Sequence, residues 1–151
     1  MANKKITDLT PASALTGAEL LEAVQSAASV KVLASAIKTY VNKNVVSAVT
    51  IASGVANIDL ALGDYFTVAM SENITSLTFT NLPGSGYGVS KTLKITQHAS
   101  AAKTFAMPSS FKWAGGTTGV ISTTLSAVDR LTLVSDDNGT TYTAVLAKDI
   151  K

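Results

Sequence analysis

The chain has 151 residues, of which 46% are hydrophobic and only 15% are charged, and its 12 basic and 10 acidic residues give a formal net charge of +2. The basic residues are scattered, with Lys4 and Lys5 the one adjacent pair, so we see no clustered cationic face and expect no nucleic-acid partner. The absence of cysteine excludes disulfides and thiolate nucleophiles. A single histidine cannot build the usual zinc site, so we expect no metal and no cofactor.

The start of the chain is charged and has no apolar core of the kind that a secretory signal needs. No stretch approaches about 18 uninterrupted apolar residues, so we expect no membrane-spanning segment and no membrane partner. Threonine and serine are frequent where charged residues are scarce, and threonine suits the half-exposed face of a strand. The composition therefore predicts a soluble, mostly β protein whose weakly charged surface tolerates close neighbours.

Residues 1–45 differ in pattern from the rest and predict an N-terminal docking or oligomerisation arm. Residues 6–17 show little periodicity and contain a proline and a glycine, which is typical of an extended segment. Residues 35–44 predict a short helix that begins at a capping serine and buries Ile37 and Tyr40. A helix of about ten residues is marginal by itself, so it needs a surface to dock on.

Residues 18–34 fit two alternatives. In a helix, Leu20, Leu21 and Val24 fall on one face with a period of 3.6. In a β-hairpin, the two halves of the segment flank a turn of small residues at positions 26–28, and valines alternate with other residues in the second half. Propensity favours a helix for the first half and a strand for the second.

From residue 46 onward the hydrophobic period becomes two, as in strands. The expected strands cover residues 46–52, 55–62, 64–70, 74–80, 89–97, 103–107, 119–125, 128–134 and 140–147. In the last hairpin, Asn138 and Gly139 supply the positive φ that tight turns demand. Short strands at this spacing, with turn residues between them, predict a jelly-roll-like β-sandwich or barrel over residues 46–151.

The polar residues do not form a recognisable catalytic set. His98 is the single histidine. The sequence has no G-x-S-x-G elbow and singles out no acidic partner for His98, so we expect a surface or turn residue there. Asp136 and Asp137 lie in the predicted hairpin turn, where short polar side chains bind the local backbone. Asp59 and Asp64 bracket another turn without a visible cleft. The sequence predicts no catalytic residues and no metal ligands, and the protein is not expected to be an enzyme.

The segment PSSFKWAGGTTG, residues 108–119, contains the single tryptophan of the chain. In an extended segment Phe111 and Trp113 point to one side and Lys112 points to the other. Two such aromatic residues suit a lid on the core or a subunit contact. The alternative is a sugar-stacking platform in which Trp113, Lys112 and Tyr87 contact a glycan.

Two segments resemble structural proteins of tailed bacteriophages. Residues 5–41, KITDLTPASALTGAELLEAVQSAASVKVLASAIKTYV, are similar to a recurrent N-terminal module of phage tail-fibre and head-fibre proteins, with the pattern I-T-D-L-x-x-A-x-x-L-T-G-x-E-L, a Val-rich hairpin and a short helix opened by serine. From Ile58 to Leu146, the order of LALGDYFTVAMSENITSLTFTNLPGSG, MPSSFKWAGGTTG and VDRLTLVSDDNGTTY is similar to a β domain of phage fibre and virion proteins. One departure is Ala27–Ala28, where a double glycine is expected.

The resemblance implies a virion component that is assembled in the host cytoplasm and has no activity of its own. It favours a homotrimeric capsid-decoration or head-fibre protein that binds phage capsid or tail proteins through its arm. The alternative is a small tail-fibre or adaptor protein whose β domain binds host-surface carbohydrate. The arm residues expected to contact the virion or sibling chains are Ile6, Leu9, Leu15, Leu20, Leu21, Val24, Ile37 and Tyr40.

Overall fold

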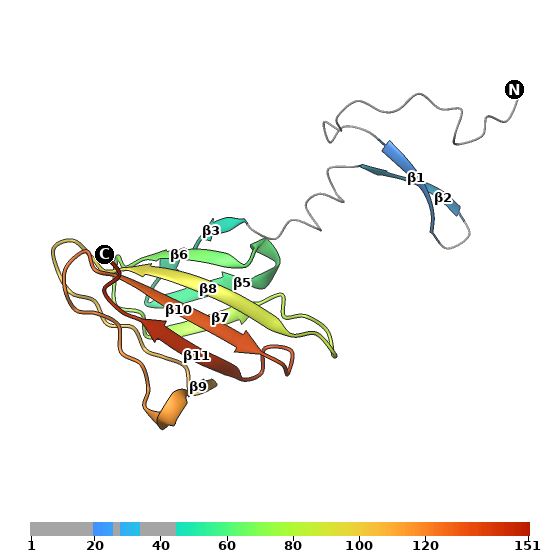
Figure 1. Ribbon diagram of the computed structural model, residues 1–151. Helices are drawn as coiled ribbons and strands as arrows, with labels where there is room; N and C mark the ends of the chain where they lie inside the picture. Colours follow the sequence, from blue (N-terminus) through green and yellow to red (C-terminus); the bar gives the residue numbers. More distant parts are fainter. Residues whose placement is uncertain (1–19, 26–27, 34–44) are drawn as a thin grey trace, which may run out of the picture. The chain divides into compact units, whose positions relative to one another are not determined.

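The computed structural model describes residues 20–25, 28–33 and 45–151 (Figure 1). The chain divides into two compact units, with the boundary between Lys43 and Asn44. The described residues of the first unit lie in strands, and the second unit contains strands and short 3₁₀ helices. In the described ranges, no helix is long and apolar enough to cross a membrane.

The first unit contains a two-stranded antiparallel sheet of β1 (Leu20–Gln25) and β2 (Ala28–Leu33). Of the two alternatives for residues 18–34, the structure therefore contains the hairpin and not the helix. Leu20, Leu21 and Val24 fall within β1. The extended segment over 6–17 and the helix over 35–44 lie outside the described residues. The same applies to five of the predicted arm contacts, which are Ile6, Leu9, Leu15, Ile37 and Tyr40.

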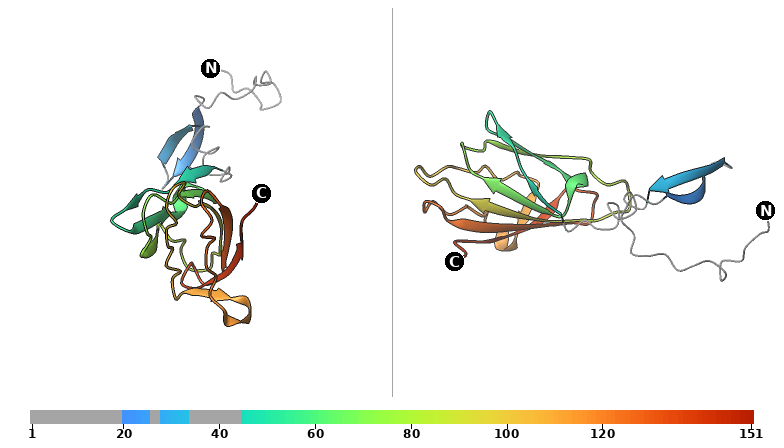
Figure 2. Two further views of the ribbon diagram at one scale, coloured as in Figure 1. Left: turned by 90° about the vertical axis from the view of Figure 1, so that its left-hand side faces the viewer. Right: turned by 90° about the horizontal axis from the view of Figure 1, so that it is seen from above.

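The second unit contains two mixed sheets, so the prediction of a mostly β protein is confirmed. One sheet has the order β3 (Val46–Ala48), β6 (Tyr65–Ala69), β8 (Val89–Thr96), β10 (Val128–Ser135), β11 (Tyr142–Ala147) and β9 (Phe111–Trp113). The other has the order β4 (Ile51–Ala52), β5 (Val55–Asp59) and β7 (Ser76–Thr80). In Figure 2 (right), the yellow-to-red strands β8, β10 and β11 lie along one side of this unit.

The chain winds back and forth between the two sheets. Successive strands β5, β6, β7 and β8 alternate between the three-stranded and the six-stranded sheet. As a result β5 pairs with β7 in parallel, and β6 pairs with β8 in parallel. Parallel neighbours cannot be joined by a tight turn and need a crossover connection, and here a strand of the opposite sheet lies within each crossover.

Both sheets contribute to one hydrophobic core. Ile58 and Leu77 come from the three-stranded sheet, while Phe66, Leu93 and Leu131 come from the six-stranded sheet. The alternation predicted for residues 89–97 is confirmed, because its odd-numbered members Val89, Lys91, Leu93, Ile95 and Gln97 are all buried. Two of these are polar, and both form hydrogen bonds within the fold.

The predicted strand over residues 46–52 is wrong as a single element, because it is two strands in different sheets. After β3 the Val49 N–H donates to the Thr67 carbonyl at 2.9 Å, and the chain then leaves the six-stranded sheet. β4 turns back into β5 through Ser53 and Gly54, whose φ values are 52° and 76°. Positive φ at both central residues is the conformation that two-residue hairpins favour.

The strand predicted over 55–62 ends at Asp59. The Asp59 carboxylate accepts a hydrogen bond from the Ala61 N–H at 2.9 Å and caps a short 3₁₀ helix, η2 (Leu60–Leu62). This turn breaks the alternation of the strand. Leu62 would point inward with Ile58 and Leu60 if the predicted strand continued to residue 62, but it is 55% exposed.

Two further predicted strands are not present as strands. Residues 119–125 form none, because the Ser122 N–H and hydroxyl donate to the buried Asp129 carboxylate at 2.6 and 2.7 Å instead of to a neighbouring strand. Residues 103–107 make only one isolated parallel bridge, at Phe105. Apolar residues in a loop can be buried without joining a sheet when a side chain satisfies the backbone donors.

Candidate functional site

Trp113 belongs to a cluster of four aromatic side chains, with Phe79, Phe111 and Tyr142. β9 pairs in parallel with β11, and this pairing places Phe111 opposite Tyr142. The Phe111 and Tyr142 rings meet edge to face, with centroids 5.7 Å apart. Phe79 stacks on Tyr142 at 4.9 Å, and Trp113 is tilted against Phe111 at 6.4 Å. These arrangements are those that aromatic pairs prefer in a core.

Trp113 is half-buried, and its ring lies against Gly119. A Cβ added at Gly119 would lie 2.5 Å from Cζ3 of the Trp113 ring, so only a glycine leaves the room that this ring occupies. The Trp113 Nε1–H is buried and has no hydrogen-bond partner among the described residues. An enclosed N–H cannot donate to a ligand from solvent, so the geometry favours a lid on the core over a sugar platform.

The other two members of the predicted glycan set do not share this environment. Lys112 is exposed on the opposite side of β9, and its Nζ donates to the Ser109 carbonyl at 3.1 Å. Tyr87 is 68% exposed and belongs to the loop over residues 81–88. That loop is tied to the β10–β11 connection, because the Gly86 N–H donates to the Asn138 side chain.

His98 and the paired aspartates have local structural roles. His98 follows β8, and its Nδ1 lies 3.1 and 3.3 Å from the backbone nitrogens of Ser100 and Ala101, which donate to it. Asp59 accepts a hydrogen bond from the Asn81 side chain at 2.7 Å, and this bond, with the bond from Ala61, lowers the pKa of its carboxyl. Within the described residues, no group of three or more His, Asp or Glu side chains could hold a metal ion.

The predicted role of Asp137 in turn chemistry is confirmed. Its carboxylate accepts hydrogen bonds from the hydroxyl and N–H of Thr141, from the hydroxyl of Ser135 and from the N–H of Thr140. These bonds, led by that of the Thr141 hydroxyl, lower the pKa of Asp137 to about 2. Asn138 and Gly139 next to it have positive φ values of 61° and 83°, as predicted.

Two buried charged residues form bonds that sequence reasoning did not assign. Lys91 donates from Nζ to the Gly63 carbonyl and to the Asp64 carboxylate, both at 2.7 Å, and to the Leu60 carbonyl at 3.2 Å. Asp129 accepts from Ser122 and from the Asp149 N–H. Because their bonds lie within the fold, these charges fasten loops to the six-stranded sheet rather than form a reactive site.

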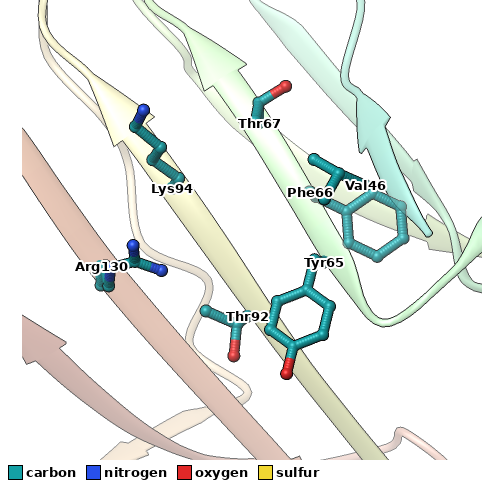
Figure 3. Close-up of a pocket in the computed structure, with 7 residues that line it drawn as sticks. All are labelled: Val46, Tyr65, Phe66, Thr67, Thr92, Lys94 and Arg130. Carbon is teal, nitrogen blue, oxygen red and sulfur yellow. The ribbon is translucent and has the colours of Figure 1, made fainter. Parts of the chain in front are cut away.

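A groove on the outer face of the six-stranded sheet is a better candidate for a binding site. It has a volume of about 160 Å³ and is lined by Val46, Tyr65, Phe66, Thr67, Thr92, Lys94 and Arg130 (Figure 3). The register places Thr67, Lys94 and Arg130 in one row across β6, β8 and β10. Tyr65 and Thr92 form the neighbouring row. Lys94 thus has Thr67 as its neighbour on β6 and Arg130 as its neighbour on β10.

Sequence reasoning missed this groove because its members are spread over residues 46–130. The alternation in residues 89–97 did place Lys94 on the outward side of its strand. Its neighbours became known only with the parallel pairing of β6 with β8 and the antiparallel pairing of β8 with β10. Pairing register of this kind is not encoded in any one strand.

Comparisons of this chain with protein-family models, with curated proteins and with solved structures found no match. The resemblance to phage fibre proteins therefore stays a prediction. A functional assignment depends on the geometry of the two units and on the sequence patterns themselves.

Proposed function

We propose that this protein is a structural component of a tailed-phage virion, a homotrimeric capsid-decoration or head-fibre protein that binds the particle through residues 1–45. In this proposal the second unit projects from the particle as a β-sandwich. The protein has no catalytic role. Its localisation is the virion, and its partners are sibling chains and capsid or tail proteins.

The observation that carries the proposal is the two-stranded sheet of the first unit. A two-stranded hairpin is marginally stable at best in water unless another surface covers it. Its register pairs Leu20 with Leu33, Leu21 with Val32 and Ala23 with Val30, so three of its six pairs join two apolar residues. Between them lies the oppositely charged pair Glu22–Lys31. We infer that sibling chains and the viral shell cover the apolar positions.

The second unit supports the proposal through its core and its surface. Core residues from both sheets form one cluster, as a β-sandwich requires, although the parallel neighbours differ from the antiparallel order of a jelly roll. Several large apolar side chains are exposed, namely Val45, Val46, Leu62, Leu82, Val120, Leu125, Val134 and Val145. A surface with few charges and exposed apolar groups suits repeated contacts in an assembly, because the centres of interfaces are depleted of charge.

Light scattering and mass photometry of the purified full chain test the proposal. We expect a trimer at micromolar concentration. Replacing Leu21 by Glu puts a charge into an apolar pair and should convert the trimer into monomers with a folded second unit. The matched control is Ser29→Glu, which adds the same charge at the polar position that pairs with Val24 and should leave the trimer intact.

Electron micrographs of particles with and without the protein test the second half of the proposal. Additional density on the capsid surface is expected in particles that carry the wild-type chain, and none in particles offered the Leu21→Glu variant. A stable wild-type monomer, or a trimer that persists in the Leu21→Glu variant, would show that the hairpin is not the oligomer contact.

A further inference from the structure

We propose that the groove across β6, β8 and β10 binds the charged group of an acidic saccharide, with Lys94 and Arg130 as its counter-ions. This inference concerns the second unit alone and does not depend on the oligomeric state of the protein. It also differs from the alternative drawn from the sequence, in which Trp113, Lys112 and Tyr87 contact a glycan.

The first argument is the charge of the groove. Lys94 and Arg130 are directly opposite each other on antiparallel strands, and both are exposed. Like charges in directly opposite positions destabilise a sheet. Neither side chain forms an ion pair with a described residue, since the two ion pairs in that part of the chain are Lys91–Asp64 and Lys151–Asp149. The protein thus maintains a local repulsion that an external anion would remove.

The second argument is the absence of acidic residues around the pair. The alternate, outward positions of β6, β8, β10 and β11 hold Tyr65, Thr67, Ala69, Ser90, Thr92, Lys94, Thr96, Val128, Arg130, Thr132, Val134, Thr143, Val145 and Ala147. No Asp or Glu occurs among them. Because none of these strand positions carries a carboxylate beside the two cations, we expect a positive potential over the groove.

The third argument is the character of the other lining residues. Tyr65 is 43% exposed and offers a ring face beside the cations. Thr67 and Thr92 contribute hydroxyls that both donate and accept hydrogen bonds. Sugars present hydroxyls and an apolar ring face, so an aromatic ring, threonine hydroxyls and a charge pair together match a sugar that carries an anionic group.

The size of the groove limits its occupant. Sites for drug-sized ligands have volumes of about 300–1,000 Å³, and this groove has about 160 Å³. It can hold one charged sugar residue and not a cofactor. A stable protein partner needs roughly 800 Å² of surface on each side, far more than the seven residues that line the groove provide. A single acidic sugar unit of a polymer is therefore the occupant that we favour over an acidic protein surface.

Amide chemical-shift titration of the ¹⁵N-labelled full chain tests this inference with matched probes. Glucuronate carries a carboxylate and glucose 6-phosphate carries a phosphate, each on a glucose-type ring. Glucose is the uncharged control for the ring, and acetate and inorganic phosphate are the controls for the charge without a ring. We expect saturable shifts at Tyr65, Thr67, Lys94 and Arg130 with one or both charged sugars, at dissociation constants on the order of millimolar. Which charged sugar binds more tightly identifies the anionic group. Equal binding of glucose, equal binding of the ring-free anions, or no shift with either charged sugar overturns the inference.

Charge-removing variants test the same site independently. Arg130→Gln and Lys94→Gln should each weaken binding of the preferred charged sugar by about fivefold. Lys112→Gln removes the same charge from β9 of the same sheet and should leave the affinity unchanged. In the absence of sugar, Arg130→Gln should melt at the same temperature as the wild type or higher, because a like-charge pair is gone. Loss of affinity in Lys112→Gln instead would locate the site at the Trp113 segment and overturn the assignment.

Discussion

The contact between Gly119 and Trp113 leads to a prediction that one substitution can test. In Gly119→Ala the new methyl carbon would lie 2.5 and 2.7 Å from two atoms of the Trp113 ring, closer than real Cβ atoms approach other atoms, and 3.2 Å from a third. The ring cannot simply rotate away, because it packs against Phe111 in the aromatic cluster. The substitution must therefore push the indole out of its position or shift the loop over residues 117–119.

The size of the effect follows from two opposing contributions. Inserting a methyl group into a packed site costs about 1–3 kcal/mol. Gly119 does not have the positive φ that alanine resists, so the lower entropy of the unfolded chain returns about 0.4–1 kcal/mol. A net loss of about 1–2 kcal/mol remains. For a unit of this size, that corresponds to a melting temperature roughly 4–10 °C lower.

Trp113 is the single tryptophan of the chain, so its fluorescence reports this change directly. We expect a lower melting temperature and a red-shifted emission in Gly119→Ala. Gly84→Ala is the control, since a Cβ there meets nothing within 4 Å and its φ is not positive. If Gly119→Ala and Gly84→Ala have the same stability and the same emission as the wild type, the indole does not lie on Gly119 and the role of a lid is wrong.

Two further predictions concern charged groups. Lys91→Met should lower the free energy of unfolding, measured by urea denaturation, by about 2–3 kcal/mol. This is less than the usual cost of breaking a buried ion pair, because the Asp64 side chain is 34% exposed and is hydrated again when Lys91 is lost. The control Lys148→Met, at an exposed position, should change this free energy little. Asp137→Asn should be less stable than the wild type at pH 7, because the folded-state pKa of Asp137 is lowered to about 2 and the charged form is therefore the stabilised one. That advantage of the wild type should disappear as the pH falls from about 4 to about 2, and a difference in unfolding free energy that stays constant over this range would contradict the assignment.

The sequence predicted the second unit best where the alternation within a single strand decides which of its side chains are buried. The alternation of residues 89–97 includes Lys91 and Gln97 among inward positions, and both are buried. The pair Asn138–Gly139 predicted positive φ correctly, since its residue types favour that conformation. Such signals need no knowledge of distant segments.

The strand predictions failed where a side chain replaced a neighbouring strand as hydrogen-bond partner. Asp59 caps η2 and ends β5, and Asp129 takes the donors of Ser122 and keeps that segment out of a sheet. In both cases a single carboxylate accepts a backbone hydrogen bond, and the segment does not form the strand that its alternating apolar residues predict. Ser53 and Gly54, which lie between two predicted strands, are residue types found in tight turns and could have predicted the hairpin of β4 and β5.

The site depended on information that the sequence does not carry locally. Lys94 and Arg130 are 36 positions apart by their numbers and meet only because β8 and β10 pair in one register. Tyr65 joins them through a parallel pairing whose crossover passes through the other sheet. A lysine or an arginine in a strand does not by itself indicate which residue will lie beside it in the sheet. Basic residues that are scattered along the sequence can therefore still be neighbours in the fold.

The winding of the chain between two sheets also determines the order in which the second unit can be completed during synthesis. β8 receives its neighbour β6 from earlier in the chain and its neighbour β10 from much later, and β9 obtains its partner only when β11 has been made. On the ribosome, β3 to β8 can therefore pair among themselves first, while β8 keeps one edge unpaired until β10 has emerged. Products that end before β11 leave β9 and one edge of β10 without a partner, and should therefore be insoluble or degraded.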